Sequence, residues 1–314
     1  MRSVYEKIKI KGMSKEQWME LRRTGIGGSD AAAVANMSPF SNPMKVFEDK
    51  MGTLVEDVES EKMSQGTAFE DYCARKFSTE TGYKVRRSHF MYRSKEFPWM
   101  IANVDRFLET GSANKIGLEC KCCSVWNKSA WSQGVPVYYY LQVMHYMIVL
   151  GIREFYVAVT FLSDSFRYYH VKWDQEVADW LIEVERDFWI NNILMGISPS
   201  PDGSDICSNI LQQRYGEAKR NSQIKLVGFD EMLDKRSERA DEISRLQKEQ
   251  KKIDQEIQVY MKENEIAVSD KYRVLWGNIE TTRFDSKRFK EEQPDLYQKY
   301  AVTSASRRFQ VKVA

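Results

Sequence analysis

Two neighbouring stretches of this sequence decide its fold: residues 100–108, MIANVDRFL, and residues 116–122, IGLECKC. Both read as β-strands, and the turn-forming residues 110–114 between them predict an antiparallel hairpin. If the turn is centred on Ser112, Asp105 lies directly opposite Glu119, because the two are equidistant from that residue. Lys121 then shares a face with Glu119, since side chains alternate along a strand.

This arrangement indicates metal-dependent chemistry. A lone Glu-x-Lys on a strand is typical of ordinary alternation between an apolar and a polar face. Asp105, which stands among apolar neighbours, adds a second carboxylate beside Glu119. Two adjacent buried carboxylates repel unless a cation holds them, and hard oxygen ligands suit Mg²⁺. A lysine beside such a site orients or deprotonates water and stabilises phosphate charge, which predicts metal-assisted phosphodiester hydrolysis.

The remaining patterns predict a mixed α/β (α+β) fold with a central mixed β-sheet flanked by helices. Capping boxes that begin at Ser14 and at Thr67 each predict a helix, the second closed by Gly82. Further helices are expected over residues 138–150 and 175–195. The other expected strands cover residues 83–93, 154–162 and 166–173.

Composition excludes several classes of protein. The chain has 314 residues, with 47 basic and 45 acidic residues and a net charge of +2. It has no long uncharged apolar run that could span a membrane, and no apolar segment typical of a secretory signal follows the N-terminus. The five cysteines, three of them bunched at residues 120–123, suit neither a disulfide framework nor a zinc site. We therefore expect a soluble cytoplasmic protein with buried thiols. The small net charge excludes little, because clustered acids can offset a basic channel.

Asp105 followed by Glu119-Cys120-Lys121 resembles the core of the PD-(D/E)XK nuclease superfamily. More specifically, the chain resembles the YqaJ-type viral recombinase family, relatives of phage lambda exonuclease. Four further stretches match that family in order: residues 23–30 (RTGIGGSD), 66–70 (GTAFE), 142–147 (QVMHYM) and 188–189 (FW). The resemblance implies a restriction-endonuclease-like core.

The resemblance also implies roles for the residues of the hairpin. Asp105 and Glu119 would ligate Mg²⁺, with Mn²⁺ as a substitute, helped by the backbone carbonyl of Cys120. Lys121 would assist the attacking water. No Gly-Lys-Ser/Thr follows the glycine-rich turn at residues 25–28, so ATP dependence is not expected.

Two helices would complete the site. Glu70 would act from its helix, indirectly or as a metal ligand, although it also occupies the capping-box position three residues after Thr67. Gln142 would face the active site from the adjacent helix, with Tyr146 one turn along the same face. The alternative for Gln142 and Tyr146 is an amphipathic core helix with one satisfied polar residue.

DNA contacts are expected at three places. Arg23 and Ser29, at a glycine-rich turn that opens a helix, are candidates for holding a DNA phosphate, as is Tyr146. Arg86 and Arg87 form a local basic patch, although a solvated strand face explains them nearly as well. Two tryptophans either stack on DNA or pack in the core: Trp126 and Trp131.

Four parts are predicted along the chain: a nuclease domain over residues 1–200, a linker over 201–229, a charged long helix over 230–265 and an α+β extension over 266–314. Within the long helix, one polar and five apolar positions alternate at spacings of three and four. They are Ile243, Leu246, Gln250, Ile253, Ile257 and Tyr260. The seam fits a coiled coil between chains or a helix that packs on its own chain.

The resemblance implies a phage- or prophage-encoded exonuclease that would resect linear duplex DNA from the 5′ end. By resemblance, its partners would be double-stranded DNA ends and a RecT-type annealing protein, which receives the 3′ single strand. A homo-oligomeric ring, such as a trimer, is expected, and no membrane partner. The alternatives are a structure-specific or nicking endonuclease with the same chemistry, and a non-catalytic DNA-binding or assembly protein.

Overall fold

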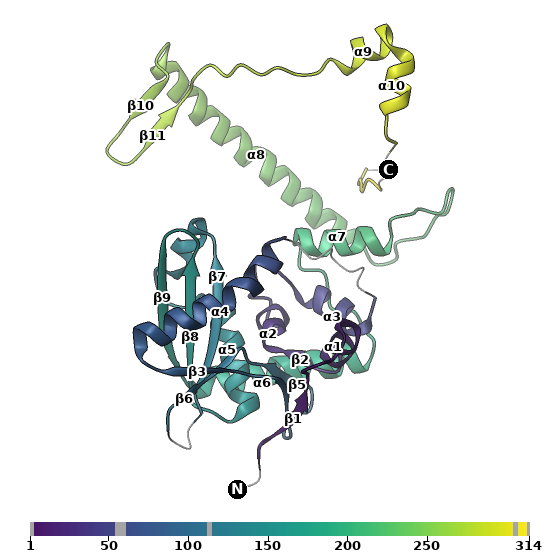
Figure 1. The fold of residues 1–314 in the computed structure, drawn as a ribbon. Coiled ribbons are helices and arrows are strands. Elements are labelled where there is room, and N and C mark those ends of the chain that lie inside the picture. The colour runs from purple at the N-terminus through teal and green to yellow at the C-terminus, as the bar shows by residue number, and fades with distance from the viewer. Residues whose placement is uncertain (1–2, 54–60, 112–114, 304–306, 313–314) are drawn as a thin grey trace. The chain divides into compact units, whose positions relative to one another are not determined.

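The computed structural model describes residues 3–53, 61–111, 115–303 and 307–312 (Figure 1). It divides into two units, Met1–Arg214 and Tyr215–Ala314, and each is described here by itself. Among the described residues, no helix is both long enough and apolar enough to cross a membrane.

The first unit contains two β-sheets. The five-stranded sheet has the order β3 (Lys84–Arg87), β6 (Arg106–Glu109), β7 (Gly117–Cys123), β8 (Glu154–Phe161) and β9 (Ser165–Lys172). Its neighbouring strands are antiparallel except β7 and β8, which are parallel. The four-stranded sheet has the order β1 (Tyr5–Lys9), β4 (Phe90–Ser94), β5 (Met100–Asn103) and β2 (Ile26–Gly27).

Helices surround both sheets. They are α1 (Lys15–Arg23), α2 (Gly28–Val34), α3 (Pro43–Met51), α4 (Glu61–Thr81), the 3₁₀ helix η1 (Val125–Trp131), α5 (Val137–Leu150), α6 (Gln175–Phe188), the π-helix η2 (Trp189–Leu194) and α7 (Asp205–Arg214). Mixed sheets flanked by helices confirm the predicted fold class.

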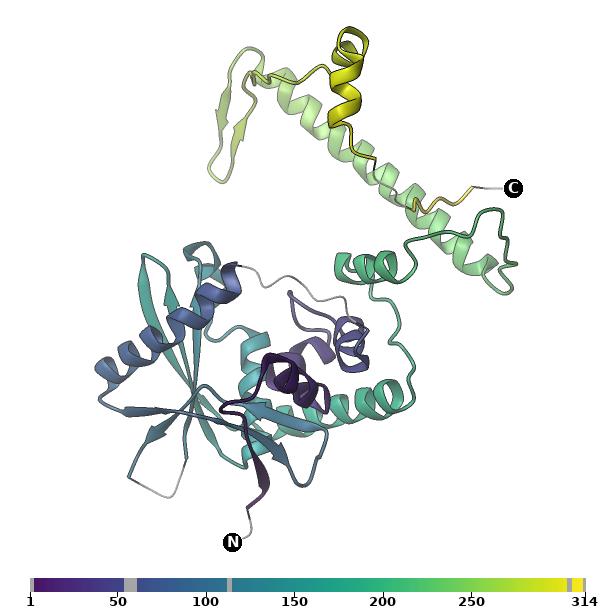
Figure 2. The ribbon, with the colours of Figure 1, turned by 45° about the vertical axis from the view of Figure 1, so that its right-hand side comes forward.

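Helices α4 and α5 cover opposite faces of the five-stranded sheet (Figures 1 and 2). On the α4 side, Phe77 packs with Leu118 and Ala158 in one apolar cluster. On the α5 side, Val157 and Val159 belong to the main core. This alternation turns the odd-numbered residues of β7, among them Glu119, toward α5.

The register of the hairpin confirms the predicted pairing. Arg106 lies opposite Leu118, and Phe107 lies opposite Gly117. One more step in that register brings Asp105 opposite Glu119. Part of the predicted turn, residues 112–114, lies outside the described residues.

Two of the predicted strands are each divided between the two sheets, which corrects the sequence-based boundaries. The segment 83–93 forms β3 and β4, and the segment 99–108 forms β5 and β6. The two breaks lie side by side, where the amide of Ser88 donates to the carbonyl of Asp105 over 3.2 Å. Asp105 therefore occupies the point where the chain passes from one sheet into the other.

One of the two predicted capping boxes is present. Ser14 accepts from the amide of Gln17, whose side chain accepts from the amide of Ser14, and α1 begins there as expected. The box at Thr67 is wrong, because α4 begins at Glu61 and residue 67 lies inside the helix. The good helix formers at residues 61–65 extend the helix through Gly66. This removes the capping role that competed for Glu70.

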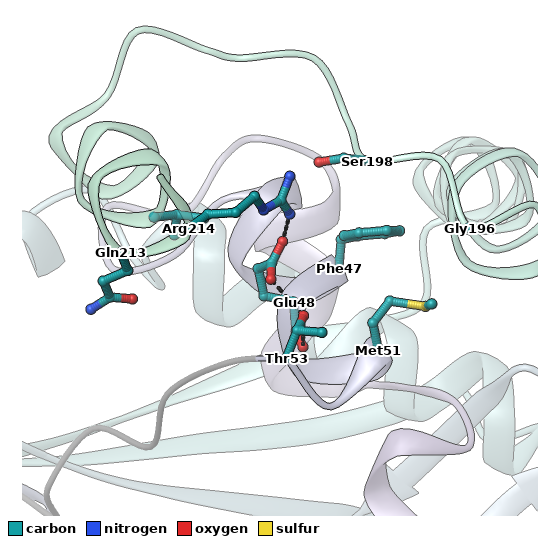
Figure 3. A pocket seen from close by; sticks show the side chains of 9 residues that line it. Phe47, Glu48, Met51, Thr53, Gly196, Ser198, Gln213 and Arg214 are labelled. Carbon is teal, nitrogen blue, oxygen red and sulfur yellow. Dashed lines mark hydrogen bonds and ion pairs between the residues drawn. The ribbon is translucent and has the colours of Figure 1, made fainter. Parts of the chain in front are cut away.

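The first unit extends beyond the predicted boundary at residue 200, since α7 packs onto it. Arg214 forms an ion pair with Glu48 of α3, and Figure 3 shows the two side chains meeting across a pocket of about 390 Å³. Cys207 lies 3.6 Å from Met44, sulfur to sulfur, and both are buried. These contacts place α7, which was expected in a linker, inside the first unit.

The second unit is built around one long helix. It contains α8 (Asp230–Met261), the antiparallel strands β10 (Ile266–Val268) and β11 (Arg273–Leu275), α9 (Ser286–Glu292) and α10 (Pro294–Tyr300). The predicted helix 230–265 thus ends four residues early. Ile243, Leu246 and Ile253 of the predicted seam are half-exposed.

Replacing Gly117 with alanine should destabilise the first unit. A Cβ at this position would lie 2.1 Å from the ring of the buried Phe155, which faces Gly117 on β8. Overpacking of this kind costs about 1–3 kcal/mol of unfolding free energy. Calorimetry should show a lower melting temperature for the transition of this unit. Gly277→Ala, whose Cβ meets only ordinary contacts, is the control; equal effects of the two changes would contradict the prediction.

Candidate active site

Asp105 and Glu119 form the centre of the candidate site. The Asp105 Oδ2 atom accepts from the backbone amide of Cys120 over 2.9 Å, which fixes this carboxylate against β7. Glu119 is 4% exposed, and its Oε1 atom accepts from Lys121 Nζ at 2.8 Å and from Gln142 Nε2 at 2.6 Å. Its Oε2 atom is buried and has no hydrogen-bond partner among the described residues.

Gln142 of α5 connects the other polar groups. Its Oε1 atom accepts from Lys121 Nζ at 3.0 Å, and its Nε2 group also donates to the hydroxyl of Tyr146 at 2.9 Å. Gln142 and Tyr146 are both buried. The helix thus presents two polar side chains, one turn apart, to the face of β7 that carries Glu119, as the sequence predicts.

Glu70 lies beside this pair rather than within it. Its Oε2 atom is 3.8 Å from the guanidinium of Arg87 on β3. Burial and the negative charge of Asp105 raise the pKa of Glu70. Arg86, which precedes Arg87 on the strand, is exposed and points to the face of the sheet opposite to that of Arg87. Of these two predicted arginines, Arg87 is the one that reaches the acidic cluster.

The pKa values of the two central carboxyl groups are raised, which indicates that the positive charge around them does not balance their negative charge. Burial, followed by the negative charge of Asp105, raises the pKa of Glu119 to about 8. Burial also raises the pKa of Asp105. Burial alone would lower the pKa of Lys121, but the charges around it, chiefly that of Glu119, outweigh this and raise that pKa. Lys121 therefore stays an ammonium at neutral pH.

The residues present fit a hydrated divalent cation. The unpartnered Glu119 Oε2 atom and the raised pKa values of Glu119 and Asp105 fit a site that can take a cation, because a positive charge there would lower both pKa values. In the described part of the chain, no group of three or more His, Cys, Asp and Glu side chains is arranged to hold a metal. Two carboxylates and a backbone carbonyl suit Mg²⁺, which keeps several waters and uses substrate phosphates as further ligands.

At the glycine-rich turn, the arginine next to Ser29 is Arg22 and not the predicted Arg23. Arg22 NH2 donates to Ser29 Oγ at 2.7 Å and to Asp30 Oδ1 at 3.1 Å. Arg23 instead points to Asp49, with its Nε atom 3.8 Å from the carboxylate. The phase of α1 explains this, because Arg22 follows Trp18 by one turn and lies over its ring.

Asp30 fixes this turn from inside. It accepts from Lys50 Nζ at 2.7 Å and from the amide of Gly27 at 3.0 Å, and the Lys50 side chain is fully buried. Burial alone would raise the pKa of Asp30, but the positive charges of Lys50 and Arg22 hold it well below its ordinary value. The aspartate is thus a structural anchor and leaves Ser29 exposed at the surface.

The turn is in direct contact with α5. A Cβ on Gly28 would lie 2.3 Å from the ring of Tyr146, so only glycine allows the observed approach. The hydroxyl of the same tyrosine accepts from Gln142 Nε2, which also donates to Glu119. A continuous chain of contacts therefore links the start of α2 to the carboxylate pair.

The structure separates the two tryptophans that follow β7. Trp131 is fully buried in the main core, whereas Trp126 is 88% exposed. A stacking role on DNA is wrong for Trp131 and remains open to Trp126.

The sequence is similar to that of a known family of proteins. The profile of the YqaJ-like viral recombinase domain matches residues 17–153. The chain is 33% identical to YqaJ of Bacillus subtilis (strain 168) over 305 residues, which cover 96% of this chain and 95% of that protein.

Solved structures show a similar fold. An alkaline exonuclease of Laribacter hongkongensis, LHK-Exo, aligns with 58% of this chain and 94% of its own at 15% identity and a TM-score of 0.48. LHK-Exo in complex with dAMP aligns with 64% of this chain and 98% of its own at 13% identity and a TM-score of 0.50. The second alignment shows a shared fold.

Replacing Asp30 with asparagine should destabilise the first unit strongly, because the Lys50 ammonium would stay buried without its main counter-charge. Losing one partner of a buried pair costs about 3–5 kcal/mol at pH 7. Since folding lowers the pKa of Asp30, its contribution is present above the unfolded value, near 3.9, and is lost as the pH falls toward the lower folded value.

Urea unfolding at a series of pH values measures this difference. The stability difference between the unmodified protein and Asp30→Asn should be large at pH 7 and should begin to decrease only below about pH 4, as the pH falls toward the folded pKa of Asp30. Asp179→Asn, at an exposed position, should leave stability unchanged. A gap that does not depend on pH would contradict the assigned charge state.

Proposed function

The chain belongs to the YqaJ-like viral recombinase family, and on that premise we propose that it is a metal-dependent deoxyribonuclease. It digests linear duplex DNA from the 5′ end and leaves 3′ single strands for annealing-type recombination. The observation that carries this proposal is the pair of the buried Glu119 and the half-buried Asp105, with an unpartnered Glu119 oxygen and a charged Lys121 beside it.

The metal proposed for this site is Mg²⁺, with Mn²⁺ as a substitute and no requirement for ATP. Asp105, Glu119 and the carbonyl of Cys120 would hold it, with Glu70 acting at longer range. Such a cation polarises the scissile phosphate and lowers the pKa of the attacking water.

Lys121 and Gln142 supply the rest of the chemistry. Lys121, whose ammonium lies beside Glu119 and Gln142, acts by orienting water and by stabilising negative charge on the phosphate. The Oε1 atom of Gln142 accepts a hydrogen bond from the Lys121 ammonium, and its Nε2 group donates one to Glu119. The amide thereby fixes the relative orientation of the lysine and the carboxylate.

DNA contacts are proposed on both sides of the centre. Ser29, with Arg22 in place of the predicted Arg23, holds the terminal 5′ phosphate, and Tyr146 separates this position from the metal site. Arg87 and Arg86 contact the duplex backbone near β3. The half-exposed seam of α8 supports a further proposal, a homo-oligomer such as a trimeric ring or the binding of a RecT-type annealing protein.

Glu119→Gln should reduce Mg²⁺-dependent hydrolysis of linear duplex DNA by about a thousandfold, because an amide keeps the shape but removes a charge worth several kcal/mol in the transition state. The assay compares end-labelled linear duplex with closed circular duplex. Linear DNA should be digested, and the circle should persist.

Glu109→Gln is the matched control, since Glu109 is an exposed glutamate on the neighbouring strand β6. Full activity of pure Glu119→Gln would refute the assigned site. Cutting of the circle would favour the endonuclease alternative, and no hydrolysis by the unmodified protein would favour the non-catalytic one.

Arg22→Gln should weaken digestion of DNA that carries a 5′ phosphate by roughly tenfold in kcat/KM, the loss of one charge-assisted contact of about 1.5 kcal/mol. Digestion of DNA with a 5′ hydroxyl should change little. Arg23→Gln, the adjacent change, should affect neither substrate. A larger effect at Arg23 than at Arg22 would restore the prediction made from sequence and reject the structural assignment.

A further inference from the structure

The ammonium of Lys121 has a third neighbour besides the two oxygen atoms already described. It bonds Glu119 and Gln142 on one side. On another it lies 4.5 Å from the centre of the Tyr139 ring. Tyr139 belongs to the first turn of α5, one turn before Gln142, so both side chains face β7 from the same helix.

The Tyr139 ring is held in place by an aromatic cluster. Its centroid is 5.4 Å from that of Trp131, at an interplanar angle of 32°. Trp131 is stacked on Tyr169 of β9 at 5.6 Å, and the Tyr169 hydroxyl donates to the Trp131 carbonyl at 3.1 Å. Because Trp131 is fully buried, the ring that faces Lys121 rests on a fixed surface.

The neutral ring of Tyr139 can attract the Lys121 ammonium without carrying a negative charge of its own. Its face carries partial negative charge and attracts an ammonium, most strongly where water is excluded. Burial raises the pKa of Tyr139 to about 12, so its hydroxyl stays neutral and takes no proton from the lysine. The face of the ring also offers no ligand to a metal ion, unlike the carboxylate of Glu119.

We propose that Tyr139 is a positioning residue for the reaction, whose ring holds the Lys121 ammonium at the carboxylate pair through a cation–π contact. This inference rests on the nuclease activity proposed above. If Glu119 binds a metal, Lys121 must share that carboxylate, and the ring keeps the ammonium from turning out to solvent.

Two variants separate the ring from the hydroxyl. Tyr139→Phe keeps the ring and should retain kcat/KM within about twofold, whereas Tyr139→Leu should lower it about tenfold through kcat, the effect of one desolvated cation–π contact. Tyr140→Leu is the matched control on the same helical turn and should leave activity unchanged. Equal losses in Tyr139→Phe and Tyr139→Leu would overturn the proposal.

A second measurement needs no catalysis. In the full chain labelled with ¹³C at the lysine ε-carbons, the Lys121 signal is identified by its loss in Lys121→Arg. Its ε-protons should be shifted upfield by the ring in the unmodified protein and in Tyr139→Phe, and should return to the range of exposed lysines in Tyr139→Leu. Tyr139→Met, which has similar length and no ring, replaces the leucine variant if that protein fails to fold.

The activity assay and the lysine spectrum can fail independently, so failure of the proposed function can be told apart from failure of the Tyr139 proposal. An unmodified protein without hydrolytic activity would refute the proposed function, while the lysine spectrum would still decide the contact. An ordinary Lys121 shift in the unmodified protein, or a shift that persists in Tyr139→Leu, would overturn the proposal even in an active enzyme.

Discussion

The pairing of β6 with β7 brings the buried carboxylate of Glu119 and the half-buried carboxylate of Asp105 together, and the neighbouring elements are arranged around that unfavourable charge. Removing each carboxylate from water costs several kcal/mol, which only hydrogen bonds and opposite charge can offset. The Cys120 amide donates a hydrogen bond to Asp105, while Lys121 and Gln142 both donate to one oxygen of Glu119. The other oxygen of Glu119 has no hydrogen-bond partner among the described residues, and this free ligand atom is what supports the proposed metal site.

The parts of this centre that follow from local rules could be predicted from the sequence. The hairpin is short, so its symmetry alone gives the pairing of Asp105 with Glu119. Strand alternation places Lys121 beside Glu119, and helical spacing places Gln142 and Tyr146 on one face. In each case the partners are near in sequence, and the periodicity of the element fixes their relative direction.

What could not be predicted depends on contacts between distant segments. A continuous β-rich run does not show where it leaves one sheet for another, so the break beside Asp105 was missed. Arg22 and Arg23 are adjacent residues of the same type, so the sequence does not show which of them contacts Ser29. The way α1 packs places Arg22 at Ser29 and Arg23 near Asp49. Trp131 looks like a residue for stacking on DNA until β9 and α5 are known to enclose it.

The close approach of Gly28 to the ring of Tyr146 links the amino acid choices at two distant positions. A side chain at 28 would require a smaller residue at 146, and a smaller residue would deprive Gln142 of its hydroxyl partner. Substitutions at these sites are therefore not independent: an exchange tolerated in one background is excluded in another. In any collection of related sequences, the two positions should vary together or not at all.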